Sequence, residues 1–241
     1  MTGNNSVVQE QARREAGWVR ALWVMPIALL TFGAPFIAAG TLAWPVAWAW
    51  LVITLTGVVA SRVLMVKAHP ELLGERTRTL SNAGTKGWDR VLMPLIGIVG
   101  PIVVELVAGL NYRFAWPPSV GLALQLLGLA ALVCGLAAST WAMVSNRFFS
   151  SVVRIQAERG HQVESSGPYA YVRHPGYAAA IVAELGTALM LASAWALVPA
   201  AVLAGLYALR TALEDRALQA ELPGYAAYAD RVRYRLLPGV W

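Results

Sequence analysis

Long apolar stretches separated by short polar connections make up most of this chain. Four of them have the length of about 20 residues that crosses the hydrocarbon core of a bilayer, and they lie at 21–41, 44–66, 91–109 and 118–144. A fifth runs from 176 to about 209, which is too long for one crossing. Ser193 and Pro199 are typical of a reversal within it. The pattern therefore predicts a helical hairpin there and six membrane spans in all, with five as the alternative.

Composition points to the same class of protein. The 241 residues are 58% hydrophobic and 13% charged, whereas soluble domains carry roughly 25% charged residues. We therefore expect an all-α fold, a polytopic integral membrane helical bundle. The net charge of +6 favours contact with anionic membrane lipids, and a chain this apolar is a poor candidate for binding nucleic acid.

Lysine and arginine are concentrated in alternate connections. They occur in the N-terminal arm, in the loop 67–90, in the segment 145–175 and in the tail from Arg210, whereas the opposite connections hold only Arg113. Because basic residues stay on the cytoplasmic side of a membrane, both termini and the 145–175 segment are predicted to be cytoplasmic. A cell inner membrane is the expected location.

This topology divides the chain into three parts. Residues 1–20 form a polar cytoplasmic arm without the short apolar core of a cleaved signal peptide. Residues 21–144 hold the first four spans, and residues 145–241 hold the hairpin, the tail and most of the polar chemistry. The single cysteine, Cys134, lies in the fourth span, and with only three histidines the chain is not expected to hold a metal.

The richest polar segment runs from Gly167 to Tyr177, just before the hairpin. Pro168 and Pro175 favour extended backbone in the residues before them, so Tyr169, Tyr171 and Arg173 are expected to alternate along one side of an extended strip. Pro175 fits the first turn of the next helix. A helix start beside an arginine can hold a carboxylate or a phosphate. The alternative is that these side chains only anchor the protein at the membrane boundary.

After the hairpin the chain returns to polar sequence with the adjacent acids Glu214 and Asp215. Such a pair at a membrane boundary suits a ligand that carries hydroxyl groups or a positive charge. Because the hairpin brings the chain back to the same membrane face, we expect the 145–177 segment and the 210–238 tail to pack together and enclose a polar pocket.

Two further acids, Glu105 and Glu184, fall inside predicted spans. A carboxylate in the membrane is costly, so both are expected to face the bundle interior or a cavity. The sequence leaves open whether they make structural hydrogen bonds or have a functional role.

The order of motifs in the C-terminal part resembles the isoprenylcysteine carboxyl methyltransferase family. The residues that carry the resemblance are Asn146-Arg-Phe-Phe, Gln156, Arg159-Gly-His161, Gly167-Pro-Tyr-Ala-Tyr-Val-Arg-His-Pro-Gly-Tyr177, Arg210, Glu214-Asp215, Leu218, Gly224-Tyr-Ala-Ala-Tyr228 and Arg235-Leu-Leu-Pro238. The N-terminal half resembles the family only as generic membrane helices.

The resemblance implies a membrane methyltransferase that binds S-adenosylmethionine at the cytoplasmic face and admits a lipophilic acceptor from the bilayer. Asp215 stands where the family usually has a second glutamate. The cofactor contacts that the resemblance implies are Gln156, His161, Gly167, Tyr169, Val172, Arg173, His174, Pro175, Tyr177, Glu214 and Asp215.

The acceptor expected from the family is an isoprenylcysteine-like carboxylate, which is methylated on oxygen. Arg210, Glu214 and Arg235 are the candidate catalytic residues. Either arginine could position the carboxylate of the acceptor through a bidentate pair. Three alternatives stay open. One is a phospholipid N-methyltransferase, another is an NADPH-dependent sterol-type reductase, and the third is a non-catalytic membrane protein. The sequence Gly-Tyr-Ala-Ala after Pro175 argues against the reductase.

Small residues at the start of the fifth span suggest where a lipophilic acceptor enters. Small side chains leave room beside a helix or let a second helix approach closely. The first reading predicts a lateral gap, and the second predicts tight packing. The residues concerned are Gly176, Ala178, Ala179, Ala180 and Ala183.

Overall fold

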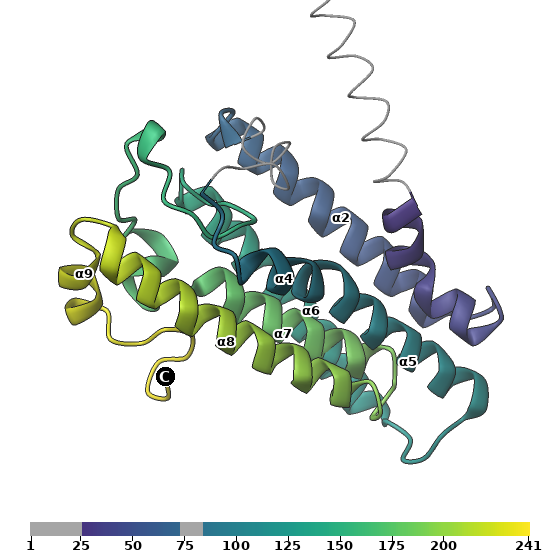
Figure 1. The fold of residues 1–241 in the computed structure, drawn as a ribbon. Coiled ribbons are helices and arrows are strands. Elements are labelled where there is room, and N and C mark those ends of the chain that lie inside the picture. The colour runs from purple at the N-terminus through teal and green to yellow at the C-terminus, as the bar shows by residue number, and fades with distance from the viewer. Residues whose placement is uncertain (1–25, 73–83) are drawn as a thin grey trace, which may run out of the picture.

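The computed structural model describes residues 26–72 and 84–241. Within them the regular structure is helical, and the long helices run roughly side by side in one bundle (Figure 1). This confirms the predicted all-α fold. The arm 1–20, the start of the predicted first span and the centre of the 67–90 loop lie outside the described residues.

The helices follow the apolar stretches of the sequence closely. An apolar helix, Pro26–Ala39, precedes the first labelled element. The labelled elements are α2 (Pro45–Ala68), α4 (Asp89–Pro94), the π-helical turn η2 (Leu95–Val99), α5 (Gly100–Phe114), α6 (Leu122–Ser145), the 3₁₀ turns η3 (Ala157–Arg159) and η4 (Gly167–Ala170), α7 (Pro175–Met190), α8 (Leu197–Glu221) and α9 (Tyr225–Arg231).

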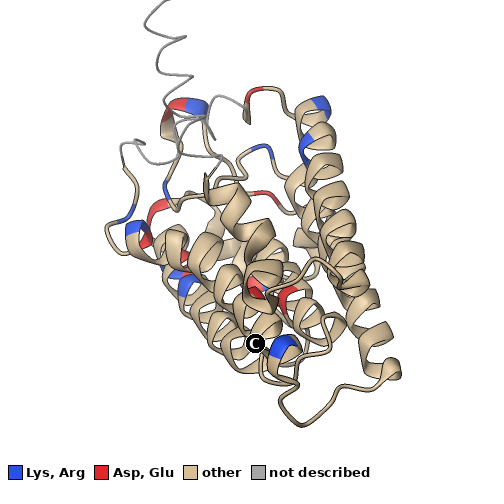
Figure 2. Ribbon diagram, turned by 90° about the vertical axis from the view of Figure 1, so that its right-hand side faces the viewer, with Lys and Arg blue, Asp and Glu red and all other residues tan. Residues whose placement is uncertain are grey.

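Four helical stretches among the described residues are long and apolar enough to cross a membrane: α2, the continuous run Asp89–Phe114, α6 and α8. Charged residues are correspondingly sparse along the helices (Figure 2). Two shorter apolar helices, Pro26–Ala39 and α7, accompany them. The chain is an integral membrane protein by these criteria. The count of six spans stays a prediction, because these two helices are shorter than the roughly 20 residues of a full crossing.

The predicted reversal in the last apolar stretch is confirmed. Helix α7 ends at Met190 and α8 begins at Leu197. Ser193 is fully buried between them. Its hydroxyl donates to Asn111 Oδ1 at 2.8 Å and accepts from the Ala196 amide at 3.1 Å. These bonds satisfy a buried polar group and fix the hairpin against α5.

Glycines let α6 and α7 approach until their backbones touch. A Cβ atom added at Gly186 would lie 2.5 Å from the Leu132 amide nitrogen, and one added at Gly135 would lie 2.7 Å from the Ala179 carbonyl oxygen. Helix α6 therefore fills the space beside Ala179 and Ala183. The predicted lateral gap is wrong at these two positions, and the tight packing of two helices explains the small residues.

This contact predicts a specific effect on stability. Gly186→Ala should lower the free energy of unfolding by about 1–3 kcal/mol, because the added methyl group meets backbone that cannot rotate away. Gly205→Ala in α8 is the matched control, since nothing lies within 4 Å of its added methyl group. Thermal unfolding of the two variants in detergent measures the difference. Equal melting temperatures would contradict the close contact.

Candidate functional site

The segment after α6, the start of α7, the end of α8 and α9 lie at one end of the bundle (Figure 1). A pocket is formed between them. Its empty volume is about 800 Å³, including the part open to solvent. The residues that line it and carry polar or aromatic side chains are Asn146, Phe148, Phe149, Ser150, Arg154, Gln156, His161, Gln162, Glu164, Tyr169, Arg173, His174, Tyr177, Glu214, Tyr225 and Tyr228.

The strip before α7 is not extended as predicted. Residues Gly167–Ala170 form a 3₁₀ turn, in which the Tyr171 amide donates to the Pro168 carbonyl at 3.2 Å. Pro168 favours this turn because its fixed φ suits a first helical position. As a result Tyr169 and Arg173 are buried, whereas Tyr171 is 67% exposed. The predicted alternation of these three side chains along one side is therefore wrong.

Gly167 is required by this turn. Its φ of +55° lies in the left-handed region, and an added Cβ atom would lie 2.6 Å from Ser145 Oγ. A larger residue would push the turn away from the end of α6. The predicted place of Pro175 in the first turn of α7 is confirmed.

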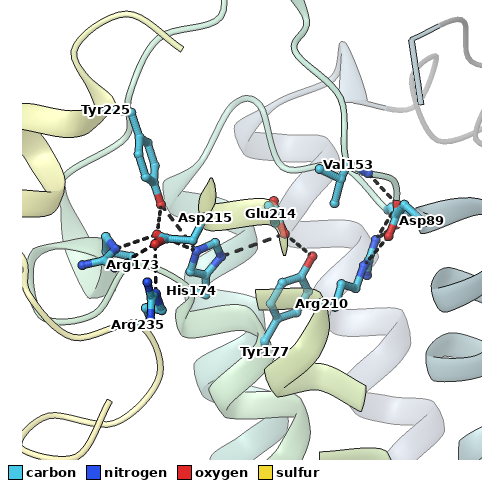
Figure 3. A network of polar contacts seen from close by, with 11 residues as sticks. Asp89, Val153, Arg173, His174, Tyr177, Arg210, Glu214, Asp215, Tyr225 and Arg235 are labelled. Carbon is cyan, nitrogen blue, oxygen red and sulfur yellow. Dashed lines mark hydrogen bonds and ion pairs between the residues drawn. The ribbon is translucent and has the colours of Figure 1, made fainter. Parts of the chain in front are cut away.

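Asp215 is the centre of a buried polar network (Figure 3). Its carboxylate is fully buried and accepts two bonds from Arg173, at 2.7 Å from Nε and 2.9 Å from Nη2. Arg235 Nε donates to it at 2.9 Å and the Tyr225 hydroxyl at 3.0 Å. Burial, and then the charge of Asp215, raises the pKa of Tyr225 above its ordinary value, so this hydroxyl stays protonated and donates.

The same region joins the strip to the tail. Arg173 Nη1 donates to the carbonyls of Val232 at 2.7 Å and Arg233 at 2.9 Å. The backbone amides of Arg173 and His174 donate to the carbonyls of Tyr234 and Arg235, each at 2.9 Å. The Tyr228 hydroxyl donates to the Tyr169 carbonyl at 2.7 Å. The predicted packing of the 145–177 segment on the 210–238 tail is confirmed.

Glu214 has a different environment from its neighbour. Its side chain lines the pocket and is 21% exposed. It accepts a bond from the Tyr177 hydroxyl at 2.6 Å, and His174 Nδ1 lies 3.9 Å away. The His174 and Tyr177 rings are parallel, with centroids 5.8 Å apart. Glu214 therefore presents a carboxylate to the pocket (Figure 3), whereas Asp215 points into the protein.

Asp89 forms a second buried pair with Arg210. Arg210 donates to its two oxygens at 2.7 and 3.0 Å, and the Val153 amide donates to it at 2.7 Å. Arg210 also donates to the Ser151 carbonyl at 2.7 Å and lies 5.2 Å from the centroid of the Tyr177 ring. Asp89 thereby connects α4 to α8 and to the segment 146–166 between α6 and η4, which we call the pocket loop.

Gln156 and His161 line the pocket and hydrogen-bond to the backbone of the pocket loop. Gln156 is 1% exposed, and its Nε2 donates to the Phe148 carbonyl at 2.7 Å. His161 Nδ1 accepts from the Gln156 amide at 3.3 Å. Burial, and then the charges of Arg159 and Arg154, lower the pKa of His161 to about 4. The ring is therefore neutral at pH 7. Because Nδ1 accepts a hydrogen bond, the ring hydrogen is on Nε2, which can donate a hydrogen bond to a ligand.

The structure brings most of the sequence-predicted residues together. Seven of them line the pocket: Gln156, His161, Tyr169, Arg173, His174, Tyr177 and Glu214. The other six are not among the lining residues: Gly167, Val172, Pro175, Arg210, Asp215 and Arg235. Both candidate catalytic arginines, Arg210 and Arg235, pair with buried aspartates.

Sequence reasoning missed Asp89 and the pocket-facing tyrosines Tyr225 and Tyr228. In the sequence Asp89 is an ordinary loop charge before an apolar run, and nothing marks its partner. The tyrosines share a helical face, which is the signal that places them in the small core around Leu222.

The arrangement suits an organic ligand better than a metal. Tyrosine and phenylalanine side chains offer flat apolar surface, and Glu214 offers one negative charge. In residues 26–72 and 84–241 no group of three or more His, Cys, Asp and Glu side chains is placed to hold a metal ion.

Comparison with known proteins gives a match for the part of the chain that forms most of this pocket. No curated protein matches the chain. A family match extends from α6 to the end of α8, which includes the pocket loop, the strip and Glu214 but neither Asp89 nor Arg235. Residues 126–220 of this membrane protein match the isoprenylcysteine carboxyl methyltransferase family, which confirms the resemblance carried by their motifs.

Proposed function

We propose that this protein is a membrane methyltransferase that uses S-adenosylmethionine to methylate a lipophilic acceptor. The observation that carries the proposal is the pocket at the end of the bundle, which is lined largely by the family-matched region, with the Glu214 carboxylate in its wall. The cytoplasmic side is the expected location of this pocket.

The donor set of the pocket fits S-adenosylmethionine. That compound supplies a methyl group activated by a positively charged sulfur, and it also carries an amine, hydroxyl groups and a flat base. Glu214 would hold a positive or hydroxyl-bearing part, and the His161 Nε2 hydrogen and the aromatic walls would hold the base. Asp215, Gly167, Val172 and Pro175 would act indirectly, by fixing the strip that presents Arg173 and His174.

The chain's own residues would contribute mainly by position. The Tyr177 hydroxyl holds Glu214 at 2.6 Å, and the buried networks on either side limit its movement. Methyl transfer needs little more than alignment and exclusion of water. A rigid, partly enclosed pocket next to apolar helices is suited to both.

The expected acceptor, an isoprenylcysteine-like carboxylate, would need a cation to receive it. The two arginines that could receive this carboxylate already form ion pairs, Arg210 with Asp89 and Arg235 with Asp215. We therefore propose that both have a positioning role. A phospholipid-like amine, the second candidate, has no need of a free arginine.

The decisive test is binding of S-adenosylmethionine compared with NADPH, measured by calorimetric titration of the purified protein. We expect only the first to bind. Glu214→Gln should weaken binding at least tenfold, because a charge-assisted hydrogen bond contributes about 1.5–3 kcal/mol. Glu221→Gln is the control, since Glu221 is exposed and pairs with Lys86. Binding of NADPH alone would support a reductase instead.

Asp215→Asn should separate the roles of the two adjacent acids. It leaves Arg173 and Arg235 without their buried counter-charge, and breaking a buried pair typically costs about 3–5 kcal/mol. We expect a large drop in melting temperature for this variant and little change for Glu214→Gln. A melting temperature equal to that of the wild type would show that the Asp215 network does not hold the tail in place.

Asp89→Asn should weaken binding of S-adenosylmethionine about tenfold, although Asp89 lies outside the family-matched region. The reason is that Arg210 then no longer holds Tyr177 and the pocket loop. Asp89→Asn combined with Arg210→Gln should cost no more than either change alone, as expected for one interacting pair. Asp230→Asn, at an exposed position of α9, is the control. Additive losses would contradict a shared role.

A further inference from the structure

After α9 the chain returns toward the bundle, and its segment 235–241 lies beside α8 (Figure 1). The first three amides of this segment all donate to the Trp241 carbonyl, at 2.9, 2.9 and 3.2 Å. These bonds close the segment into a compact loop, which we call the tail loop. Arg235 Nε, which donates to Asp215 at 2.9 Å, holds the tail loop on α8.

Most of the apolar side chains of the tail loop are exposed. Val240 is 77% exposed and Leu237 is 52% exposed. Trp241 is 36% exposed, and the centroid of its ring lies 4.9 Å from the guanidinium carbon of Arg235. Single exposed apolar side chains are common on any protein, but several in one short loop mark an interaction surface.

The tail loop is held at the level where α8 leaves the membrane-spanning part of the bundle. Leu209 on α8 is apolar and 48% exposed, whereas Arg216, seven residues later, is charged and exposed. The interval between them is about 10 Å along the helix axis, which is comparable with the thickness of one headgroup layer of a bilayer, roughly 5–8 Å. Asp215 lies within this interval and holds Arg235. The tail loop therefore lies at the height of the lipid headgroups.

The charge beside the tail loop is positive. Arg231 and Arg233 are exposed just before it, and neither forms an ion pair with any residue of 26–72 or 84–241. Residues 231–241 contain three arginines and no acid. Apolar and aromatic side chains next to arginines are typical of segments that lie on negatively charged membranes.

We propose that the tail loop is a lipid-binding surface for anionic phospholipids. Leu237, Val240 and Trp241 enter the bilayer at the pocket end of the bundle. Arg231 and Arg233 bind the negatively charged headgroups. The occupant is a lipid surface, and not a second copy of the chain or a soluble protein, because the loop adjoins a membrane-spanning helix and carries only positive charge. The proposal makes no use of the reaction in the pocket and is independent of the proposed function.

A fluorescent label tests whether the tail loop enters the lipid. In a Cys134→Ser background, Val240→Cys can be labelled alone with a nitrobenzoxadiazole dye. Ala220→Cys in the same background is the matched control, because Ala220 is exposed on α8 and lies about 16 Å beyond Leu209 along the axis. Each labelled protein is placed in nanodiscs of phosphatidylcholine, or of an equal mixture with phosphatidylglycerol. Quenching by lipids that carry a nitroxide on the acyl chain is measured in both.

In the anionic mixture, we expect quenching at position 240 to exceed that at position 220 by about threefold or more, because the quencher reaches only labels that enter the bilayer. Quenching at position 240 should fall about twofold in neutral lipid, where the arginines find no negative headgroups. Arg231→Gln combined with Arg233→Gln should remove this difference between the two lipids. All the substituted positions other than 134 are exposed, so the variants are expected to fold.

Equal quenching at positions 240 and 220 overturns the proposal, and it is the result expected if a second copy or a soluble protein covers the tail loop. Quenching at position 240 that is the same in neutral and anionic lipid overturns the proposed recognition of anionic phospholipids. A difference between the two lipids that persists without Arg231 and Arg233 overturns the role of these arginines.

Discussion

The pairing of Asp215 with two arginines is the interaction on which the architecture of the site depends. Arg173 belongs to the strip before α7, Arg235 to the C-terminal tail, and Asp215 to α8. One fully buried carboxylate therefore joins three segments that are far apart in sequence. Removing two cationic groups from water is costly unless their partner is fixed in place. The helical hairpin provides this rigidity, because Ser193 holds its turn and α6 packs along α7.

Much of this arrangement follows from local sequence. The apolar stretches predict the helices, the Ser193 to Pro199 region predicts the reversal, and Pro175 predicts the start of α7. The motif order correctly groups seven of the residues that line the pocket. These features are readable because length, proline geometry and residue spacing are properties of a single segment.

The rest depends on contacts between segments, which a single sequence does not encode in a readable way. Nothing near Arg210 shows that its partner is Asp89, 121 residues earlier. Adjacent acids look equivalent in sequence, yet the helix turns Glu214 toward the pocket and Asp215 away from it. The 3₁₀ turn at Gly167 arises because the end of α6 leaves space only for a glycine there. The small residues of α7 were ambiguous until the position of α6 was known.

The bond between Asp89 and Arg210 also constrains how this sequence can change over time. Residues 126–220 contain the arginine but not the acid that neutralises it. A change at either position alone leaves one buried charge unpaired, so tolerated substitutions at 89 and 210 must occur together. The region that carries the family motifs is consequently not an independent module. It can be exchanged between proteins of this kind only with a partner helix whose first residue balances its charge.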